Sequence, residues 1–211
     1  MARRQQQILV ILGHPAADSL CAGMARAYAE GARQAGADVR FLDVGQLAFD
    51  PVLQQGYRGA QPLEPDLLAA REHITWAHHL VWVYPIWWGA MPALLKGFID
   101  RVFLPGYAFK YRPGSSLWDR LLAGRSAELL VTMDSPPWYF RWVTRMPGHH
   151  QMKKAILEFC GIRPVRVHSF GPVRTAGGAR LAQWVEQARR LGARRGASAP
   201  AGNPAPRPPL H

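Results

Sequence analysis

The segment GHPAADSLC, residues 13–21, has the composition of an anion-binding loop. It follows an apolar run and carries Asp18, Ser19, Leu20 and Cys21 where a helix is predicted to begin. Free backbone N–H groups and the helix dipole favour an anion there, and the hydroxyl of Ser19 could donate to a phosphate, as could His14. The loop contains neither GxGxxG nor GxxxxGKS/T, so it is not a glycine-rich phosphate cradle. The alternatives are that Ser19 is a plain N-cap and that His14 bonds to nearby backbone.

A second segment, YPIWWGAM, places Pro85, Ile86, Trp87 and Trp88 directly after another apolar run. Tryptophans at the edge of a sheet need a packing partner, and an isoalloxazine ring would supply one while backbone N–H groups of the loop reach its polar edge. The alternative is that both indoles fill the core or a subunit interface. This segment therefore points to a flat aromatic cofactor without excluding a structural role.

A third segment, VTMDSPPWYFRW, follows a further apolar run and combines polar side chains with aromatic ones. Thr132, Asp134 and Ser135 supply the polar groups. The aromatic residues after them are Trp138, Tyr139, Phe140 and Trp142. Such a cluster could wall a pocket for a flat substrate or form a dimer contact, since tryptophan and tyrosine are enriched in both settings. The two interpretations are compatible if the pocket lies between subunits.

Other reactive residue types lack the spacing that metal or hydrolytic chemistry requires. His149 and His150 are adjacent, so their side chains point apart on any regular element. The pair His78 and His79 has no cysteine or carboxylate at ligand spacing, and no GxSxG elbow of a hydrolase occurs. Metal binding is therefore not expected.

Cysteine content and charge narrow the protein class further. Cys21 and Cys160 are the only cysteines, too few for a disulfide framework, and they lack CxxC spacing. The net charge of +12 comes from 22 Arg and 4 Lys that are scattered over the chain without a long basic run. Nucleic-acid binding is therefore not expected, whereas a positive surface would attract anionic dinucleotides. No apolar run of about 18 residues occurs, so we expect a cytoplasmic protein.

The elements that must position these three segments alternate between strand and helix. Continuous apolar runs predict buried strands at 6–14 and 79–85, and an alternating pattern predicts a strand at 37–44. Two further strands are predicted at 126–134 and 163–173. Apolar residues spaced three and four apart predict the main helices, at 19–36, 65–79, 91–103, 151–161 and 178–191. A long connection at 45–65, a hairpin at 105–116 and a brief helix at 117–124 complete the prediction.

This alternation predicts an α/β fold, a doubly wound five-stranded parallel sheet of order 2-1-3-4-5 with helices on both faces. In that architecture ligands bind outside the carboxyl ends of the strands, where the three segments begin. Residues 1–191 form the predicted single domain. Residues 192–211, rich in Pro, Ala and Gly, are predicted to be a disordered tail.

The sequence resembles the NAD(P)H:quinone oxidoreductase branch of the flavodoxin-like superfamily, over roughly residues 7–191. The match rests on YPIWWGAMPALLKGFIDRVF with GYAFKY after it, on IxGHPxxxS in the first segment and on ILEFCG before the last strand. The resemblance implies a bound FMN or FAD, and hydride transfer from NAD(P)H through the flavin to a quinone or similar small acceptor in ping-pong order. It also implies a homodimer with the substrate pocket shared across the interface.

The resemblance also assigns site positions. Trp88 and Tyr139 are the predicted catalytic residues. The predicted flavin contacts are His14, Ser19, Leu20, Cys21, Pro85, Ile86, Trp87, Trp88, Thr132, Met133, Asp134 and Ser135. The third segment lacks the glycines of well-studied quinone reductases, and no histidine follows Tyr139 at a convincing distance for a proton relay. Cys21 stands where family members have Asn.

Three alternatives remain at this stage. The same scaffold reduces azo and nitro compounds. Relatives also serve as ancillary subunits of glutathione-gated potassium efflux transporters, for which the segment 45–65 and the aromatic third segment could be docking surfaces. The third alternative, a one-electron carrier of the flavodoxin kind, is disfavoured by the net charge of +12, since such carriers present an acidic face. The sequence leaves FMN or FAD and NADH or NADPH open, with a slight preference for FMN because no adenine-binding pattern is present.

Overall fold

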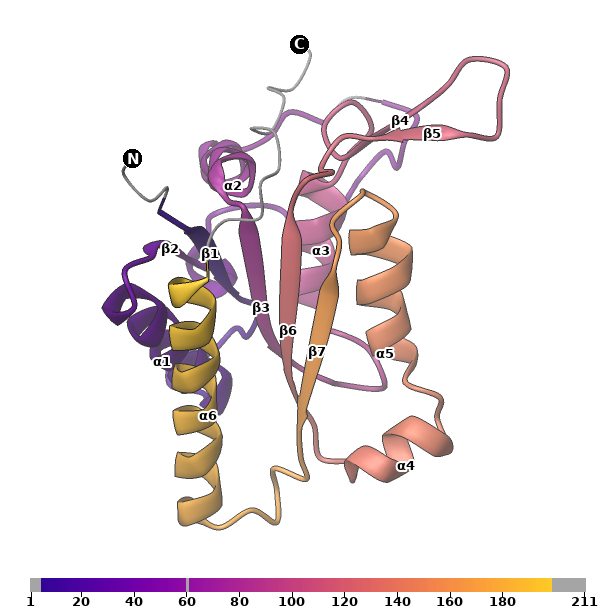
Figure 1. The fold of residues 1–211 in the computed structure, drawn as a ribbon. Coiled ribbons are helices and arrows are strands. Elements are labelled where there is room, and N and C mark those ends of the chain that lie inside the picture. Colours follow the sequence, from indigo (N-terminus) through magenta and orange to yellow (C-terminus); the bar gives the residue numbers. More distant parts are fainter. Residues whose placement is uncertain (1–4, 60, 199–211) are drawn as a thin grey trace.

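A five-stranded parallel sheet forms the centre of the computed structural model, which describes residues 5–59 and 61–198 (Figure 1). The strand order is β2-β1-β3-β6-β7, which is the predicted order 2-1-3-4-5 once the two strands of a separate hairpin are left out. The strands are β1 (Gln7–Leu12), β2 (Asp38–Asp43), β3 (His79–Pro85), β6 (Ser126–Thr132) and β7 (Val165–Phe170). Every residue of β3 is buried, as expected for a central strand covered on both faces.

Helices cover both faces of the sheet (Figure 1). Each face of the sheet has its own apolar core. On one face lie α1 (Leu20–Gln34) and α6 (Gly178–Ala197), which pack on Ile8, Val10 and Val81. The other face carries α2 (Pro65–Trp76), α3 (Ala93–Val102) and the π-helical stretch η2 (Gln151–Glu158), which continues α5 (Pro147–His150). A 3-10 turn, η1 (Val44–Gln46), follows β2.

The first and last helices approach each other unusually closely. A Cβ atom added at Gly31 would overlap the carbonyl oxygen of Arg189, and one at Gly192 would overlap that of Tyr28. A Cβ atom at Gly196 would overlap the carbonyl oxygen of Ala32 as well. Only glycine allows the two backbones to approach this far, so these three positions fix the separation of α1 and α6.

The structure corrects the prediction for residues 117–124. Instead of a brief helix, this segment contains the strand β5 (Trp118–Arg120), which pairs antiparallel with β4 (Phe109–Tyr111). The Trp118 ring stacks on Phe159 at 4.5 Å, and its Nε1–H donates to the carbonyl oxygen of Phe159 at 2.9 Å. These contacts come from a residue 41 positions further along the chain, and they outweigh the local helical preference that the sequence pattern indicates.

Two further elements differ from the sequence prediction. A short helix, α4 (Pro137–Trp142), forms within the third segment, where no helix was predicted. The closing helix does not end at residue 191 but continues through Ala197, so the predicted tail boundary at 192 is wrong for residues 192–197. The glycines at 192 and 196, which suggested a tail, are the close-contact positions against α1. The rest of the predicted tail, 199–211, lies outside the described residues.

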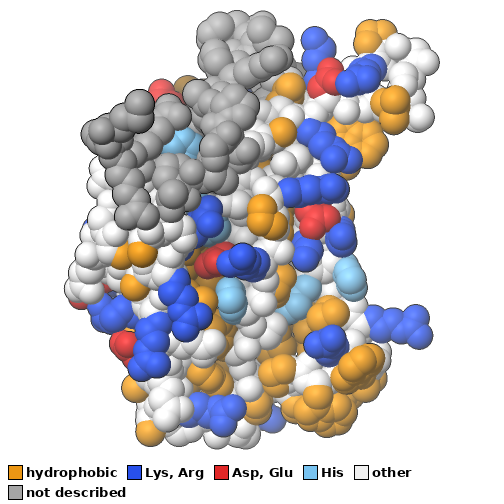
Figure 2. All heavy atoms as spheres, viewed as in Figure 1, with side chains coloured by type: hydrophobic (Ala, Val, Ile, Leu, Met, Phe, Trp, Pro, Cys, Tyr) orange, Lys and Arg blue, Asp and Glu red, His pale blue; other side chains and the backbone are white. Residues whose placement is uncertain are grey.

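Basic side chains are spread over the face of the molecule seen in Figure 2, in agreement with their scatter along the sequence. They outnumber acidic ones there and do not gather into one stripe of the kind that tracks a nucleic-acid backbone. Within residues 5–59 and 61–198, no helix is both long enough and apolar enough to cross a membrane.

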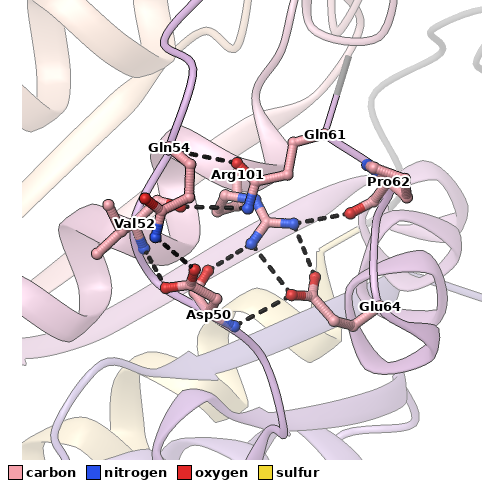
Figure 3. A network of polar contacts seen from close by, with 7 residues as sticks. All are labelled: Asp50, Val52, Gln54, Gln61, Pro62, Glu64 and Arg101. Atoms are coloured by element: carbon pink, nitrogen blue, oxygen red, sulfur yellow. Dashed lines mark hydrogen bonds and ion pairs between the residues drawn. The ribbon is translucent and has the colours of Figure 1, made fainter. Parts of the chain in front are cut away.

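The long connection 45–65 is held by a buried arginine of α3 (Figure 3). Arg101 is fully buried and donates from both terminal nitrogens to the carboxylate of Glu64, at 3.1 and 2.8 Å. It also donates to the carbonyl oxygens of Asp50 and Pro62. Partial burial raises the pKa of Glu64. The hydrogen bond from the N–H of Asp50 and the guanidinium of Arg101 lower this pKa by more, so the net shift is downward. One guanidinium therefore fixes both ends of the connection to the domain.

Candidate functional site

A hollow of about 200 Å³ lies at the carboxyl edge of the sheet, where the loops after β1, β3 and β6 meet. Ten of the twelve residues predicted as flavin contacts line it. The lining residues are His14, Ser19, Leu20, Cys21, Pro85, Ile86, Trp87, Thr132, Met133, Asp134 and Val173. The predicted residues Trp88 and Ser135 do not line the hollow, and Val173 was not predicted. Three segments that are distant in the sequence thus meet at one place.

The start of α1 presents hydrogen-bond donors to this hollow. Ser19 is the N-cap: its Oγ accepts from the N–H of Ala22 at 3.2 Å and donates to the carbonyl of Ala16 at 2.9 Å. Since the first N–H groups of a helix have no partner within it, those of Leu20 and Cys21 are available to a ligand. The sequence allowed two roles for Ser19, and in this conformation it is an N-cap whose proton is already donated.

His14 lies beside the second loop. Its Nδ1 accepts from the N–H of Ala16 at 2.9 Å, so the proton of the neutral imidazole sits on Nε2. The imidazole ring meets the Trp87 indole edge-on, with 5.5 Å between centroids and 73° between planes. The backbone bond that the sequence offered as an alternative is therefore present, and it leaves Nε2–H as the donor that His14 can offer a ligand.

Cys21 joins the first and third loops. Its Sγ lies 3.2 Å from Oγ1 of Thr132, the last residue of β6. Burial raises the pKa of the Cys21 thiol to about 11, although the hydrogen bond to Thr132 works in the opposite direction. At neutral pH Cys21 is therefore a neutral thiol that packs and bonds, and its reactivity as a nucleophile is low.

The second loop makes a tight turn, in which Trp87 faces the hollow and Trp88 faces solvent. Trp87 and Ala90 exchange two backbone hydrogen bonds, at 2.8 and 3.0 Å. Between them Trp88 has φ 50° and Gly89 has φ 79°, the left-handed pair that type I′ turns require. The left-handed conformation costs a residue such as Trp88 roughly 1 kcal/mol, and its indole is fully exposed. The structure thus places Trp87 in the hollow and Trp88 at the tip beside it.

The third loop is tied to the strand β7 at the far side of the hollow. The N–H of Met133 donates to the carbonyl of Phe170 at 2.9 Å, and the N–H of Val173 donates to that of Met133 at 3.0 Å. The Asp134 carboxylate accepts from the N–H of Arg174 at 2.9 Å. Val173 therefore enters the hollow because it follows β7, and the rule that ligands bind beyond strand ends would have included that fourth loop.

The predicted catalytic Tyr139 lies on α4 and does not line the hollow. Its ring packs edge-on against Trp138. His149 is the buried histidine closest to it in sequence: its Nε2 lies 2.9 Å from Oγ of Ser169, and its ring packs against Phe140. Burial, with a smaller contribution from His150, lowers the pKa of His149 to about 4. In the described part of the chain, no three His, Cys, Asp or Glu side chains group as metal ligands would.

Comparison with known proteins places this architecture in a family. Residues 6–193 match the family described as having the flavodoxin-like fold. The chain is 28% identical to an uncharacterized NAD(P)H oxidoreductase of Haemophilus influenzae, over 78% of this chain and 83% of that protein. It is 24% identical to NAD(P)H dehydrogenase [quinone] 1 of Rattus norvegicus, over 79% of this chain and 70% of that protein.

The fold is also similar to that of a solved structure. The crystal structure of Smu.1420 from Streptococcus mutans UA159 superimposes with a TM-score of 0.75 at 27% identity, covering 90% of this chain and 100% of that one. The residues that carried the sequence resemblance, from the first loop to the helix before β7, lie within the matched range. The chain therefore belongs to the flavodoxin-like fold family, in its NAD(P)H:quinone oxidoreductase branch.

Proposed function

We propose that this protein is a flavin-dependent oxidoreductase that passes hydride from NAD(P)H to a quinone or a similar small acceptor. The observation that carries the proposal is the hollow itself, since ten residues from three separate loops, selected from the sequence as flavin contacts, line it. The names of the relatives from Haemophilus influenzae and Rattus norvegicus support the same class of reaction.

The residues of the hollow fit a flavin phosphate and ring. The N–H groups of Leu20 and Cys21 and the Nε2–H of His14 form a donor set suited to a phosphate. The half-exposed indole of Trp87 provides a flat apolar wall, and Ile86 and Pro85 continue it. Thr132 and Asp134 supply polar atoms at the opposite side. We propose FMN rather than FAD, because no adenine-binding pattern is present in the sequence.

A bound flavin would supply the two-electron chemistry, and the protein would supply binding and orientation. In this division of roles, the start of α1 would hold the flavin phosphate, and Trp87 would orient the flavin ring. His14 holds its proton at Nε2, and the neutral thiol of Cys21 supports Thr132 without taking part in chemistry. No side-chain triad is required, in keeping with the absence of GxSxG spacing.

Purification gives the decisive test. The protein should be yellow, or should become so on reconstitution, and the chromophore released by denaturation should be FMN. The loaded protein should oxidise NADH or NADPH when a quinone is added. A colourless protein that takes up neither FMN nor FAD contradicts the proposal. A panel with azo and nitro acceptors separates quinone reduction from the alternative reductase activities.

The oligomeric state of the protein can be measured on the same preparation. We propose a homodimer, as the resemblance implies, and sedimentation equilibrium measures it directly. The transporter-subunit alternative predicts co-purification with a membrane transporter together with weak quinone turnover. Strong turnover by the isolated protein favours the enzyme.

A further inference from the structure

The lining of the hollow carries a single acidic side chain. Among the described residues that line it, Asp134 is the only Asp or Glu, and none is Lys or Arg. Asp134 is exposed and forms no ion pair with any residue that the structure describes. The hollow of a chain with a net charge of +12 therefore contains a carboxylate that no described cation pairs with.

The loop after β7 fixes the position of this carboxylate. Oδ1 of Asp134 accepts from the N–H of Arg174 at 2.9 Å. The preceding residue is held too, because the carbonyl oxygen of Met133 accepts from the N–H of Val173 at 3.0 Å. A Cβ atom added at Gly171 would overlap the same carbonyl oxygen, so the two loops pack backbone against backbone. Asp134 therefore presents its charge from a rigid part of the site.

The charge lies away from the donors that suit a phosphate. Those donors, the N–H groups of Leu20 and Cys21, follow β1, whereas Asp134 follows β6. The strand β3 lies between β1 and β6 (Figure 1), so the ends of those two strands are about 10 Å apart. Trp87, the proposed wall for the flavin ring, follows β3. A flavin phosphate at the start of α1 would therefore leave the ring as the part nearer to Asp134.

The two parts of a flavin respond differently to reduction. Hydride transfer from NAD(P)H carries two electrons and one proton to the ring and leaves NAD(P)⁺. The ring then gains one negative charge unless it also takes up a proton from solvent, whereas the charge of the phosphate does not change. Because like charges repel, a fixed carboxylate beside the ring opposes the reduced form more than the oxidised form.

We propose that the carboxylate of Asp134 weakens the binding of reduced flavin relative to oxidised flavin and so lowers the reduction potential of the bound cofactor. This inference rests on the proposed function, since it requires a flavin in the hollow. The role is electrostatic, because the carboxylate neither gives nor takes a proton or an electron. The bound flavin becomes a stronger reductant, which favours transfer to the acceptor and opposes transfer from NAD(P)H.

The reduction potential of the flavin-loaded protein tests the proposal. It is measured without oxygen, by equilibration with a redox dye of known potential. Asp134→Asn removes the charge but keeps an oxygen that can accept from the N–H of Arg174. We expect a higher potential, equivalent to a five- to tenfold tightening of reduced relative to oxidised flavin, or about 20–30 mV for two electrons. Asp134→Ser should shift the potential in the same direction, and Asp134→Glu, which keeps the charge, should stay close to the wild type.

Asp18→Asn is the matched control. Asp18 is exposed, precedes the N-cap Ser19 and does not line the hollow. Its charge lies beside the proposed phosphate end of the cofactor, which has the same charge in both redox states. Removing this charge should therefore tighten the binding of oxidised and reduced flavin alike and leave the potential unchanged.

The outcomes separate this inference from the proposed function. An unchanged or lower potential in Asp134→Asn and Asp134→Ser, or an equal rise in Asp18→Asn, overturns the role of Asp134. A flavin-loaded protein that reduces quinones with the same potential in all variants leaves the proposed reaction standing. A protein that takes up neither FMN nor FAD overturns both. The potential is an equilibrium property, so it is read without reference to turnover.

Discussion

Sγ of Cys21 and Oγ1 of Thr132 lie 3.2 Å apart and connect the first turn of α1 to the end of β6. The two residues are 111 positions apart in the sequence. Both residues line the hollow, so their contact joins the loop after β1 to the loop after β6 within the site.

Removing the Thr132 hydroxyl should weaken flavin binding. Thr132→Val keeps the shape of the side chain but removes a polar atom from the lining, which is worth about 1 kcal/mol, or a five- to tenfold rise in the dissociation constant. Quenching of flavin fluorescence during titration measures it. Thr75→Val makes the same replacement where the hydroxyl bonds to Tyr107, away from the hollow. An equal loss of affinity in both variants would remove Thr132 from the cofactor site.

Trp88 should show opposite effects on stability and activity. Trp88→Asn places Asn-Gly, the preferred pair for a turn with two positive φ angles, at positions 88 and 89. We expect the free energy of unfolding to rise by about 0.5–1 kcal/mol, because the strain is relieved. We also expect a lower flavin content or slower NAD(P)H oxidation. If both flavin content and turnover are unchanged, Trp88 is not part of the site.

The close approach of α1 and α6 should make two glycines respond in opposite directions. Gly192→Ala places a Cβ against the carbonyl of Tyr28 and should lower the free energy of unfolding by roughly 1–3 kcal/mol. Gly23→Ala, on α1, meets only ordinary contact with Val185 at 3.8 Å. It should raise stability by about 0.5–1 kcal/mol through better helix propensity. Urea denaturation of the two variants gives the comparison, and destabilisation by both would contradict the packing described.

The anchor of the long connection depends on the shape of the Arg101 side chain. Arg101→Lys keeps the charge but cannot bridge Glu64 and the carbonyls of Asp50 and Pro62 together. We expect a loss of about 2 kcal/mol and faster protease cleavage within residues 47–64. Lys96→Ala, which removes an exposed ion pair on the same helix, should change stability by less than about 1 kcal/mol. Unchanged proteolysis of Arg101→Lys would show that the connection is held elsewhere.

His149 should contribute a pH-dependent part of the stability. Its pKa is about 4 in the folded protein against 6.5 for a free histidine, so folding favours the neutral form. Its contribution is complete above pH 6.5 and is lost as the pH falls toward 4, by at most about 1.4 kcal/mol per pH unit. His149→Gln should flatten the stability profile in this window. Thermal unfolding at a series of pH values measures it, and identical slopes for the variant and the wild type would contradict the assignment.

The sequence was sufficient for the features that depend on local patterns. Buried parallel strands read as continuous apolar runs, and β3, with all seven residues buried, is the clearest example. Once the strand order is known, the carboxyl edge follows, and so do most of the hollow's residues. Cys21 and Thr132 could therefore be placed at one site although nothing in the sequence shows that they touch.

Features that depend on distant contacts were beyond the sequence. Trp118 lies in a strand because Phe159 stacks on it, and position 192 within the helix α6 is a glycine because the carbonyl of Tyr28 leaves no room for a side chain. The local sequence around Trp118 resembles that of a helix, and the local sequence around Gly192 resembles that of a linker. The outward position of Trp88 depends on two φ angles, which the residue types in WWG do not specify.

The pairing of α1 with α6 also affects how the chain is made. The first helix emerges from the ribosome early, but Gly192 and Gly196, which pack against it, are translated only after all five strands of the sheet. Until α6 has been made, the side of α1 that faces it has no partner in the nascent chain. This side of the sheet can therefore complete its native packing only after α6 has been synthesised.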